Sequence, residues 1–176
     1  MSVVALIICG APLAERVGDM VRALEDAGWG TEVVGTPMAA NWATPSSHPD
    51  LPIRLEYRTP SQRQPRSELD AVIICPATFN TANKIAAGTA DNYATSLACE
   101  SIGQGLPVVV APMVNNKLWG HPAWKSTLAT LVQAGVKLLD VQTGEPGTSP
   151  VQSGAGEIVV EGFDPAWLPK SLEEFS

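Results

Sequence analysis

The sequence contains few residues of the kinds that build disulfide frameworks, metal centres and membrane spans. Its 176 residues include three cysteines and two histidines, and Cys9, Cys75 and Cys99 lie far apart, each in or beside an apolar segment. We therefore expect buried thiols, no disulfide and no metal site. The apolar runs are much shorter than the roughly 20 residues that a helix needs to cross a bilayer, and the N-terminus shows no basic segment or cleavage site. We expect no membrane association and a cytoplasmic location.

Positive charge is also scarce. The 11 Lys and Arg residues are outnumbered by 18 Asp and Glu residues, which gives a net charge of −7 and a pI near 4.7. Proteins that bind nucleic acid use clustered cations to displace counterions from the phosphates, so we expect no nucleic acid partner. The length fits a single domain, and we expect residues 1–176 to form it.

Short apolar runs alternate with segments of helical periodicity. Runs of this length, bounded by turn residues, are typical of buried parallel strands. Helices between such strands predict a three-layer α/β fold of the Rossmann-like class, with a doubly wound parallel sheet. The expected strands are 3–9, 31–35, 71–75, 107–111 and 136–140. The expected helices are 13–24, 81–87, 92–103 and 122–134.

Particular residues predict where these elements begin and end. Gly28 and Gly30 are expected to close the first helix. Thr36 is expected to cap a helix whose first residue is Pro37. The helix at 122–134 is expected to bury an apolar stripe formed by Trp124, Leu128, Leu131 and Val132.

Two segments have the composition of loops. Residues 43–69 are rich in Pro, Ser, Arg and Gln and predict a surface loop over the sheet edge. Residues 142–156 are rich in Gly, Ser, Thr and Pro and predict a clamp-like loop. The arginines of the first loop either steer an anionic substrate or form a solvated basic face; they are Arg54, Arg58, Arg63 and Arg66.

Polar residues follow the expected strands where a parallel sheet binds its ligands. The carboxyl ends of parallel strands meet at one edge, and Gly10, Thr36 and Thr78 follow three of them closely. Backbone N–H groups after Gly10, with the dipole of the next helix, would suit a phosphate. Taken singly, each Thr or Asn also suits helix capping. A phosphate held by neutral donors, without a Walker lysine or magnesium ligands, favours flavin mononucleotide (FMN) over ATP.

Three segments carry motifs that are specific in combination. Residues 75–92 contain Cys-Pro-Ala-Thr-Phe-Asn-Thr and end in Gly-Thr-Ala-Asp-Asn. Residues 112–119 read Pro-Met-Val-Asn-Asn-Lys-Leu-Trp, and residues 36–42 read Thr-Pro-Met-Ala-Ala-Asn-Trp. These segments resemble, in order, the Ala-Pro-Ala-Thr-Ala-Asn-Thr, Pro-Ala-Met-Asn-x-x-Met-Trp and Thr-x-Ala-Ala-x-x-Phe motifs of the homo-oligomeric flavin-dependent cysteine decarboxylases. The likeness covers roughly residues 1–140.

The resemblance implies a flavodoxin-like fold, FMN at a subunit interface, and a homo-trimer or dodecamer. Family members act on a C-terminal cysteine, in a peptide or in the small molecule phosphopantothenoylcysteine. Their flavin accepts electrons from that cysteine, and the resulting thioaldehyde loses carbon dioxide. Asn115 matches the signature asparagine that binds the substrate carboxylate, and it is the expected catalytic residue. The expected cofactor-binding residues are Gly10, Ala11, Pro12, Thr36, Trp42, Pro76, Ala77, Thr78, Asn80, Thr81, Asp91, Asn92, Pro112, Met113 and Val114.

Two positions depart from the family pattern. Eight residues before Asp70 the family has a histidine, whereas this chain has Gln62, which cannot act as a general base. His48 would replace it only if its loop folded over the flavin. Residues 151–156 read Val-Gln-Ser-Gly-Ala-Gly and lack the clamp cysteine of the phosphopantothenoylcysteine enzymes. Three functions stay open: an FMN enzyme acting on a thiol-bearing carboxylate, a non-decarboxylating FMN-binding redox or binding protein, and a nucleotide or sugar-phosphate binder.

Overall fold

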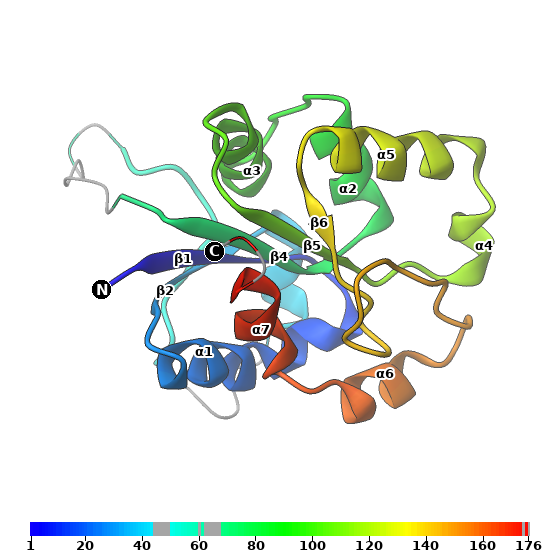
Figure 1. Cartoon of the computed structure of the whole chain (residues 1–176), viewed down its shortest axis with the longest axis horizontal. Coiled ribbons are helices and arrows are strands. Elements are labelled where there is room, and N and C mark those ends of the chain that lie inside the picture. The colour runs from blue at the N-terminus through cyan, green and yellow to red at the C-terminus, as the bar shows by residue number, and fades with distance from the viewer. Residues whose placement is uncertain (44–49, 60, 62–67, 174, 176) are drawn as a thin grey trace.

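Six parallel strands form one sheet in the order β3-β2-β1-β4-β5-β6. The computed structural model, drawn in Figure 1, describes residues 1–43, 50–59, 61, 68–173 and 175. The strands are β1 (Val3–Ile8), β2 (Gly30–Gly35), β3 (Ile53–Arg54), β4 (Ala71–Ala77), β5 (Val108–Pro112) and β6 (Lys137–Leu138). The order reverses at β1, with β2 on one side and β4 on the other, which is the doubly wound arrangement that the sequence predicted.

Helices cover both faces of the sheet (Figure 1). On one face lie α1 (Val17–Asp26), α6 (Gly156–Gly162) and α7 (Trp167–Glu173). On the other lie α2 (Phe79–Ala86), α3 (Tyr93–Gly103) and α5 (Pro122–Gln133). Three short helices sit in the connections: the 3-10 helices η1 (Pro12–Arg16) and η2 (Pro37–Asn41), and α4 (Asn116–Trp119).

The core consists of two apolar clusters, one on each face of the sheet. Successive side chains of a strand point to opposite faces, so Leu6 and Ile8 pack with α1, α6 and α7, while Ile7 and Cys9 pack with α2, α3 and α5. All four side chains are fully buried. Burial on both faces explains why the strand sequences are continuously apolar instead of alternating.

Several element boundaries differ from the sequence predictions. Gly28 closes α1 with a left-handed φ of 88°, as predicted, but Gly30 is the first residue of β2. Thr36 precedes η2 and Pro37 opens it, yet the Thr36 side chain makes no capping hydrogen bond. Val132 is 54% exposed, so its place in the apolar stripe of α5 was wrong. It follows Leu131 by one residue, which turns it about 100° around the helix and into solvent.

The expected loop at 43–69 contains a strand that the sequence pattern did not reveal. The two residues of β3 pair with Val33 and Val34 of β2, and a strand this short has no readable periodicity. Arg54 of this strand donates a 2.9 Å hydrogen bond to the hydroxyl of Tyr93 on α3 and lies 3.9 Å from a carboxylate oxygen of Glu32. Arg54 is therefore engaged in holding the sheet edge to α3. The predictions for His48, Gln62, Arg63 and Arg66 fall outside the described residues.

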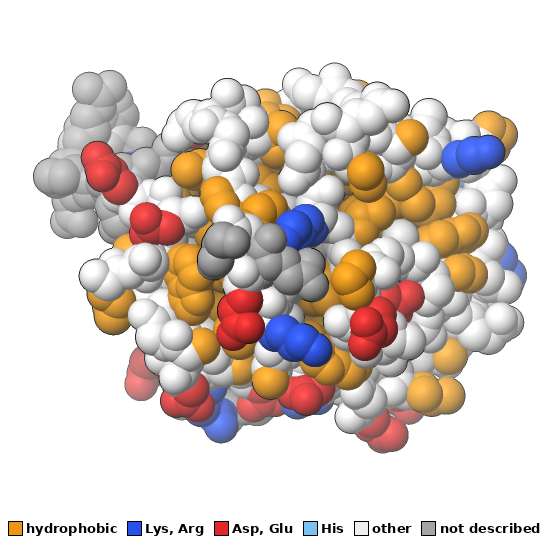
Figure 2. Space-filling model, viewed as in Figure 1, with side chains coloured by type: hydrophobic (Ala, Val, Ile, Leu, Met, Phe, Trp, Pro, Cys, Tyr) orange, Lys and Arg blue, Asp and Glu red, His pale blue; other side chains and the backbone are white. Residues whose placement is uncertain are grey.

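Charge is unevenly spread over the face shown in Figure 2. Acidic side chains gather along its lower margin, on the side of α1 and α6, and charged side chains are sparse over its upper half. Across the described part of the chain, every helix falls short of the length and apolar character that a bilayer crossing requires.

Neighbouring residues on α5 provide a matched test of the core. Leu131 is 1% exposed and Val132 is 54% exposed. We expect Leu131→Ala to lower the free energy of unfolding by about 2–5 kcal/mol, because it leaves a cavity among packed side chains. Val132→Ala should change it by less than about 0.5 kcal/mol. Urea denaturation of both variants measures the difference, and equal effects would contradict this packing of α5.

Candidate functional site

The carboxyl ends of β1, β2, β4 and β5 lie at one edge of the sheet, because all four strands are parallel. The loop after β1 passes close to η2, which follows β2. A Cβ on Gly10 would lie 2.8 Å from the Cβ of Met38, so this approach requires glycine. The loops after these strands line two neighbouring cavities, and the loop after β1 and the η2 region contribute to both.

The first of these, which we call the threonine cavity, has a volume of about 430 Å³. It brings together the hydroxyl and amide residues that the sequence predicted for the cofactor. Its lining consists of Gly10, Thr36, Pro37, Met38, Thr78, Asn80, Thr81, Lys84, Asp91 and Asn92.

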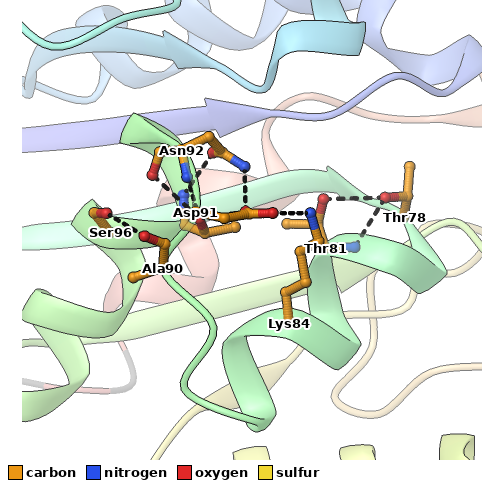
Figure 3. A network of polar contacts seen from close by, with 8 residues as sticks. Thr78, Thr81, Lys84, Ala90, Asp91, Asn92 and Ser96 are labelled. Atoms are coloured by element: carbon orange, nitrogen blue, oxygen red, sulfur yellow. Dashed lines mark hydrogen bonds and ion pairs between the residues drawn. The ribbon is translucent and has the colours of Figure 1, made fainter.

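Helix capping positions several of these side chains (Figure 3). The Thr78 hydroxyl accepts a 3.3 Å hydrogen bond from the Thr81 N–H at the start of α2, and it donates to the Thr81 hydroxyl at 3.1 Å. The Asn92 side chain accepts from the Thr95 N–H at 3.0 Å at the start of α3. Thr78 and Asn92 therefore do serve as caps, and in doing so they direct the first turns of two helices toward the cavity. Backbone N–H groups of a first helical turn are natural donors to an anion.

An ion pair lies on the wall of the threonine cavity. Lys84 Nζ is 2.5 Å from an Asp91 carboxylate oxygen, and Figure 3 shows the pair connecting α2 to the residues before α3. This hydrogen bond from Lys84 is the main reason that the pKa of Asp91 lies below its usual value. The carboxylate stays ionised at neutral pH, and the pair is lost as the pH falls through that lowered pKa. Lys84 was not among the predicted site residues, although it lies within the motif at 75–92.

Cys9 lies fully buried beneath this cavity at the end of β1. Burial raises its pKa, and hydrogen bonds from Thr81 and Thr78 offset only part of that effect. Burial likewise raises the pKa of Cys75 on β4. Both groups are neutral thiols at physiological pH, which makes them packing residues and poor nucleophiles.

The second cavity, which we call the tryptophan cavity, has a volume of about 550 Å³ and contains the expected catalytic residue. Asn115 is the N-cap of α4, where its Oδ1 accepts hydrogen bonds of 3.0 Å from the backbone N–H groups of Lys117 and Leu118. The Nδ2 amide is then the part of the side chain that has hydrogens to donate. The cavity is lined by Pro12, Glu15, Trp42, Met113, Asn115, Val151, Gln152, Ser153, Gly154, Gly156 and Glu157.

Part of the clamp-like segment at 142–156 is hydrogen-bonded to the loop that carries Asn115. The Val151 N–H donates to the Val114 carbonyl at 2.9 Å, and the Asn116 N–H donates to the Val151 carbonyl at 2.8 Å. The Ser153 N–H donates to Asn116 Oδ1 at 3.0 Å. These bonds fix residues 151–153 against the wall that Asn115 forms. Their cavity positions could not be read from the sequence, because the pairing joins segments more than thirty residues apart.

Other predicted site residues lie near the cavities but outside their linings. Ala11, Pro76, Ala77, Pro112 and Val114 are all buried at the carboxyl ends of the strands. Their backbones brace the loops: the Cys9 N–H donates to the Pro76 carbonyl at 3.1 Å, and the Met113 N–H to the Ala77 carbonyl at 2.9 Å. These bonds join neighbouring strand ends whose loops contribute residues to the two cavities.

Trp119 of the second motif is partly buried and packs against the core cluster that contains Trp124. Trp124 is 1% exposed, and its ring centroid lies 5.6 Å from that of Trp119 and 5.5 Å from that of Phe79. This cluster packs α4 and α5 against α2. Trp42 differs, because it is 41% exposed and lines the tryptophan cavity.

Comparison with known proteins identifies the family. The sequence profile of the flavoprotein family matches residues 2–159, and the chain belongs to this family. It is 33% identical over 107 residues to the coenzyme A biosynthesis bifunctional protein CoaBC of Thermococcus kodakarensis, covering 61% of this chain and 26% of that protein. It is 27% identical over 158 residues to CoaBC of Mycobacterium bovis, and this match covers 86% of this chain and 37% of that protein. The chain thus spans about a quarter to two fifths of the length of these curated relatives.

Solved structures share the fold over most of the chain. A mutant PPC decarboxylase superposes with a TM-score of 0.73 at 20% identity, covering 99% of this chain and 98% of that one. The FMN-dependent cysteine decarboxylase TvaF from thioviridamide biosynthesis gives a TM-score of 0.63 at 26% identity. The match covers 80% of this chain and 90% of TvaF. These matches confirm the predicted family and flavodoxin-like fold, and they agree with the prediction of FMN as the cofactor.

The burial of the thiols can be checked by alkylation. Cys9 and Cys75 are fully buried, whereas Cys99 is partly exposed. We expect iodoacetamide at pH 8 to label Cys99 at least about tenfold faster than the other two, because only accessible thiolates react. Peptide mapping by mass spectrometry measures the three rates, and unfolding in guanidinium should equalise them. Rapid labelling of Cys75 in the folded protein would contradict its place in β4.

Proposed function

We propose that this protein is an FMN-dependent enzyme that oxidises and decarboxylates a thiol-bearing carboxylate, the C-terminal cysteine of a peptide or of a small molecule. The observation that carries the proposal is the position of Asn115. Its amide lies in the wall of a 550 Å³ cavity, and the neighbouring threonine cavity has the donors that FMN needs. TvaF, the 26% identical structure, is an FMN-dependent cysteine decarboxylase, and this supports the same chemistry.

The residues of the threonine cavity fit a phosphate with a polyol chain. The first turn of α2, with its cap at Thr78, supplies backbone N–H groups, and Thr81 and Asn80 supply neutral polar groups. Lys84 is the cation of this lining, and Asp91 balances its charge. Thr36 and Gly10 complete the wall on the side of β1 and β2. When bound, FMN supplies an acceptor for two electrons and a proton.

Asn115 is suited to orient a carboxylate. Because the N-cap contacts use its Oδ1, the side chain is held in one orientation, and its Nδ2 hydrogens are available to a carboxylate oxygen. Residues 151–153, bonded to the adjoining backbone, form the cavity wall next to Asn115.

One observation favours a second function, an FMN-binding redox or binding protein without decarboxylation. The segment 151–156 lines the tryptophan cavity through Val151, Gln152, Ser153, Gly154 and Gly156 and contains no cysteine. A reducing step that needs a clamp thiol is therefore unavailable from this segment. This feature is compatible with an enzyme that releases an unreduced enethiol, and turnover distinguishes the two functions.

We also propose that the chain acts as a homo-oligomer, a trimer or dodecamer, in the cytoplasm. Large apolar side chains on η2 and directly after it are exposed where they line the cavities: Met38 is 60% and Trp42 is 41% exposed. Burial of such residues between subunits would complete the site. Sedimentation velocity measures the assembly, and a monomer at micromolar concentration would contradict it.

The cofactor is tested first by the visible absorption spectrum of the purified protein. We expect flavin bands, and mass spectrometry of the molecule released by heat should give the mass of FMN. A colourless protein that also fails to bind added FMN would overturn the proposal and leave a nucleotide or sugar-phosphate binder as the alternative.

A charge placed at the start of α2 tests the phosphate site. We expect Asn80→Asp to weaken FMN binding about tenfold, because the new carboxylate opposes the phosphate. Stability should not fall, since a negative charge at a helix N-terminus is favourable. Gln133→Glu, at the end of α5 and the opposite edge of the sheet, adds the same charge as a control. Fluorescence titration of each apoprotein variant with FMN measures its affinity. If the two variants lose affinity equally, the phosphate does not bind at the start of α2.

The role of Asn115 is tested with peptides that end in cysteine. We expect the wild type to remove the elements of carbon dioxide and two hydrogen atoms, as seen by mass spectrometry. Asn115→Asp keeps oxygens for the N-cap, so its melting temperature should stay near that of wild type. Its turnover should fall about a hundredfold or more, because a carboxylate then faces the substrate carboxylate.

Asn116→Asp provides the matched control for that experiment. It adds the same charge at the adjacent position, keeps an oxygen to accept from the Ser153 N–H, and lies outside the lining of the cavity. We expect it to retain turnover. If wild type binds FMN but leaves peptides and phosphopantothenoylcysteine unchanged, the second function is the correct one.

A further inference from the structure

The charged residues of the tryptophan cavity all have one sign. Glu15 and Glu157 are the charged side chains in its lining, which includes no Lys, Arg or His among the described residues. Both glutamates are exposed at the surface. The remaining polar side chains, among them Asn115 and Gln152, are neutral. The cavity thus presents two negative charges to any substrate that enters it.

The nearest arginine in sequence does not neutralise this charge within the lining. Arg16 directly follows Glu15, but its Nε is 2.5 Å from an Asp19 carboxylate oxygen. Its Nη1 donates a 2.7 Å hydrogen bond to the Val160 carbonyl of α6. The guanidinium is therefore used to link η1 with α1 and α6.

The same contacts link the two helices that carry the glutamates. Glu15 belongs to η1 and Glu157 to the first turn of α6. The bond from Arg16 to Val160 joins these two elements. They approach so closely that a Cβ on Gly156 would lie 3.1 Å from Pro12 Cγ. The backbone positions of Glu15 and Glu157 are therefore set by packing, and both exposed side chains line the cavity.

We propose that Glu15 and Glu157 are specificity-determining residues that make the tryptophan cavity select peptides with a basic or neutral residue before the terminal cysteine, and reject acidic or phosphate-bearing substrates. The inference rests on the proposed function. Every substrate of that reaction carries the terminal carboxylate, which meets the neutral amide of Asn115. The cavity can therefore distinguish between substrates only through the parts that differ, such as the residue before the terminal cysteine.

Coulomb interaction sets the size of the preference. A partly solvated charge pair changes affinity about two- to fivefold. Two glutamates that attract a lysine and repel a glutamate should together separate such peptides about tenfold. The preference acts mainly on KM, because it concerns binding and not the reacting atoms. It should shrink in 1 M salt, where the screening length is about 3 Å.

The test uses FMN-loaded protein and three peptides that differ only in the residue before the cysteine: lysine, glutamine or glutamate. We expect kcat/KM to fall in that order, with about tenfold between the first and the last. In the double variant Glu15→Gln, Glu157→Gln the ratio of lysine to glutamate peptide should approach one. Glu161→Gln removes an exposed charge from the same helix as Glu157 but outside the cavity lining, and it should keep the wild-type ratio.

Binding is measured separately, so that failure of the reaction and failure of the inference are distinguishable. Peptides ending in serine in place of cysteine cannot be oxidised, and isothermal titration calorimetry measures their affinity for the loaded protein. If these bind in the order lysine, glutamine, glutamate while no cysteine peptide is turned over, the proposed reaction fails and the selectivity stands. Equal affinities, or a preference that persists in the double variant or in 1 M salt, would overturn the inference.

Discussion

The parallel pairing of β1 with both β2 and β4 is the constraint on which the rest of the structure depends. Parallel strands require a crossover between them, and those crossovers place helices on both faces. The strands must then be apolar on both sides, which accounts for fully buried residues such as Leu6 and Ile7 next to each other in sequence. The same constraint brings the carboxyl ends of the central strands to one edge. Polar residues that are far apart in sequence meet there.

Helix capping connects this scaffold to the chemistry. Thr78, Asn92 and Asn115 each cap a helix that begins just beyond a strand or loop at this edge. A cap satisfies backbone N–H groups and at the same time fixes the orientation of the capping side chain. For Asn115 the cap uses Oδ1, and the proposed contact to a substrate carboxylate would use Nδ2. Capping and ligand binding, which looked like competing explanations from the sequence, are therefore compatible at one residue.

Much of the fold was predictable because it rests on local patterns. Apolar runs located the four long strands, and Gly28 correctly marked the end of α1. The two-residue strand β3 was missed, since its existence depends on pairing with β2. The helices α6 and α7 were not predicted either; they are only seven residues each. Val132 was misassigned, because small errors in helical phase decide whether a residue faces the core or solvent.

The sequence by itself determined the class of fold, the family and the residue types that surround the site. Those depend on composition, periodicity and motifs, which are properties of contiguous residues. Only the tertiary structure decided that the polar residues divide between two cavities, that Lys84 is paired with Asp91, and that residues 151–153 lie against the loop of Asn115. It alone placed Glu15 and Glu157, which are separated by most of the chain, in the lining of one cavity. The physical reason is that such neighbours are joined by packing and hydrogen bonds across the sheet edge, and no local pattern encodes a contact between distant segments.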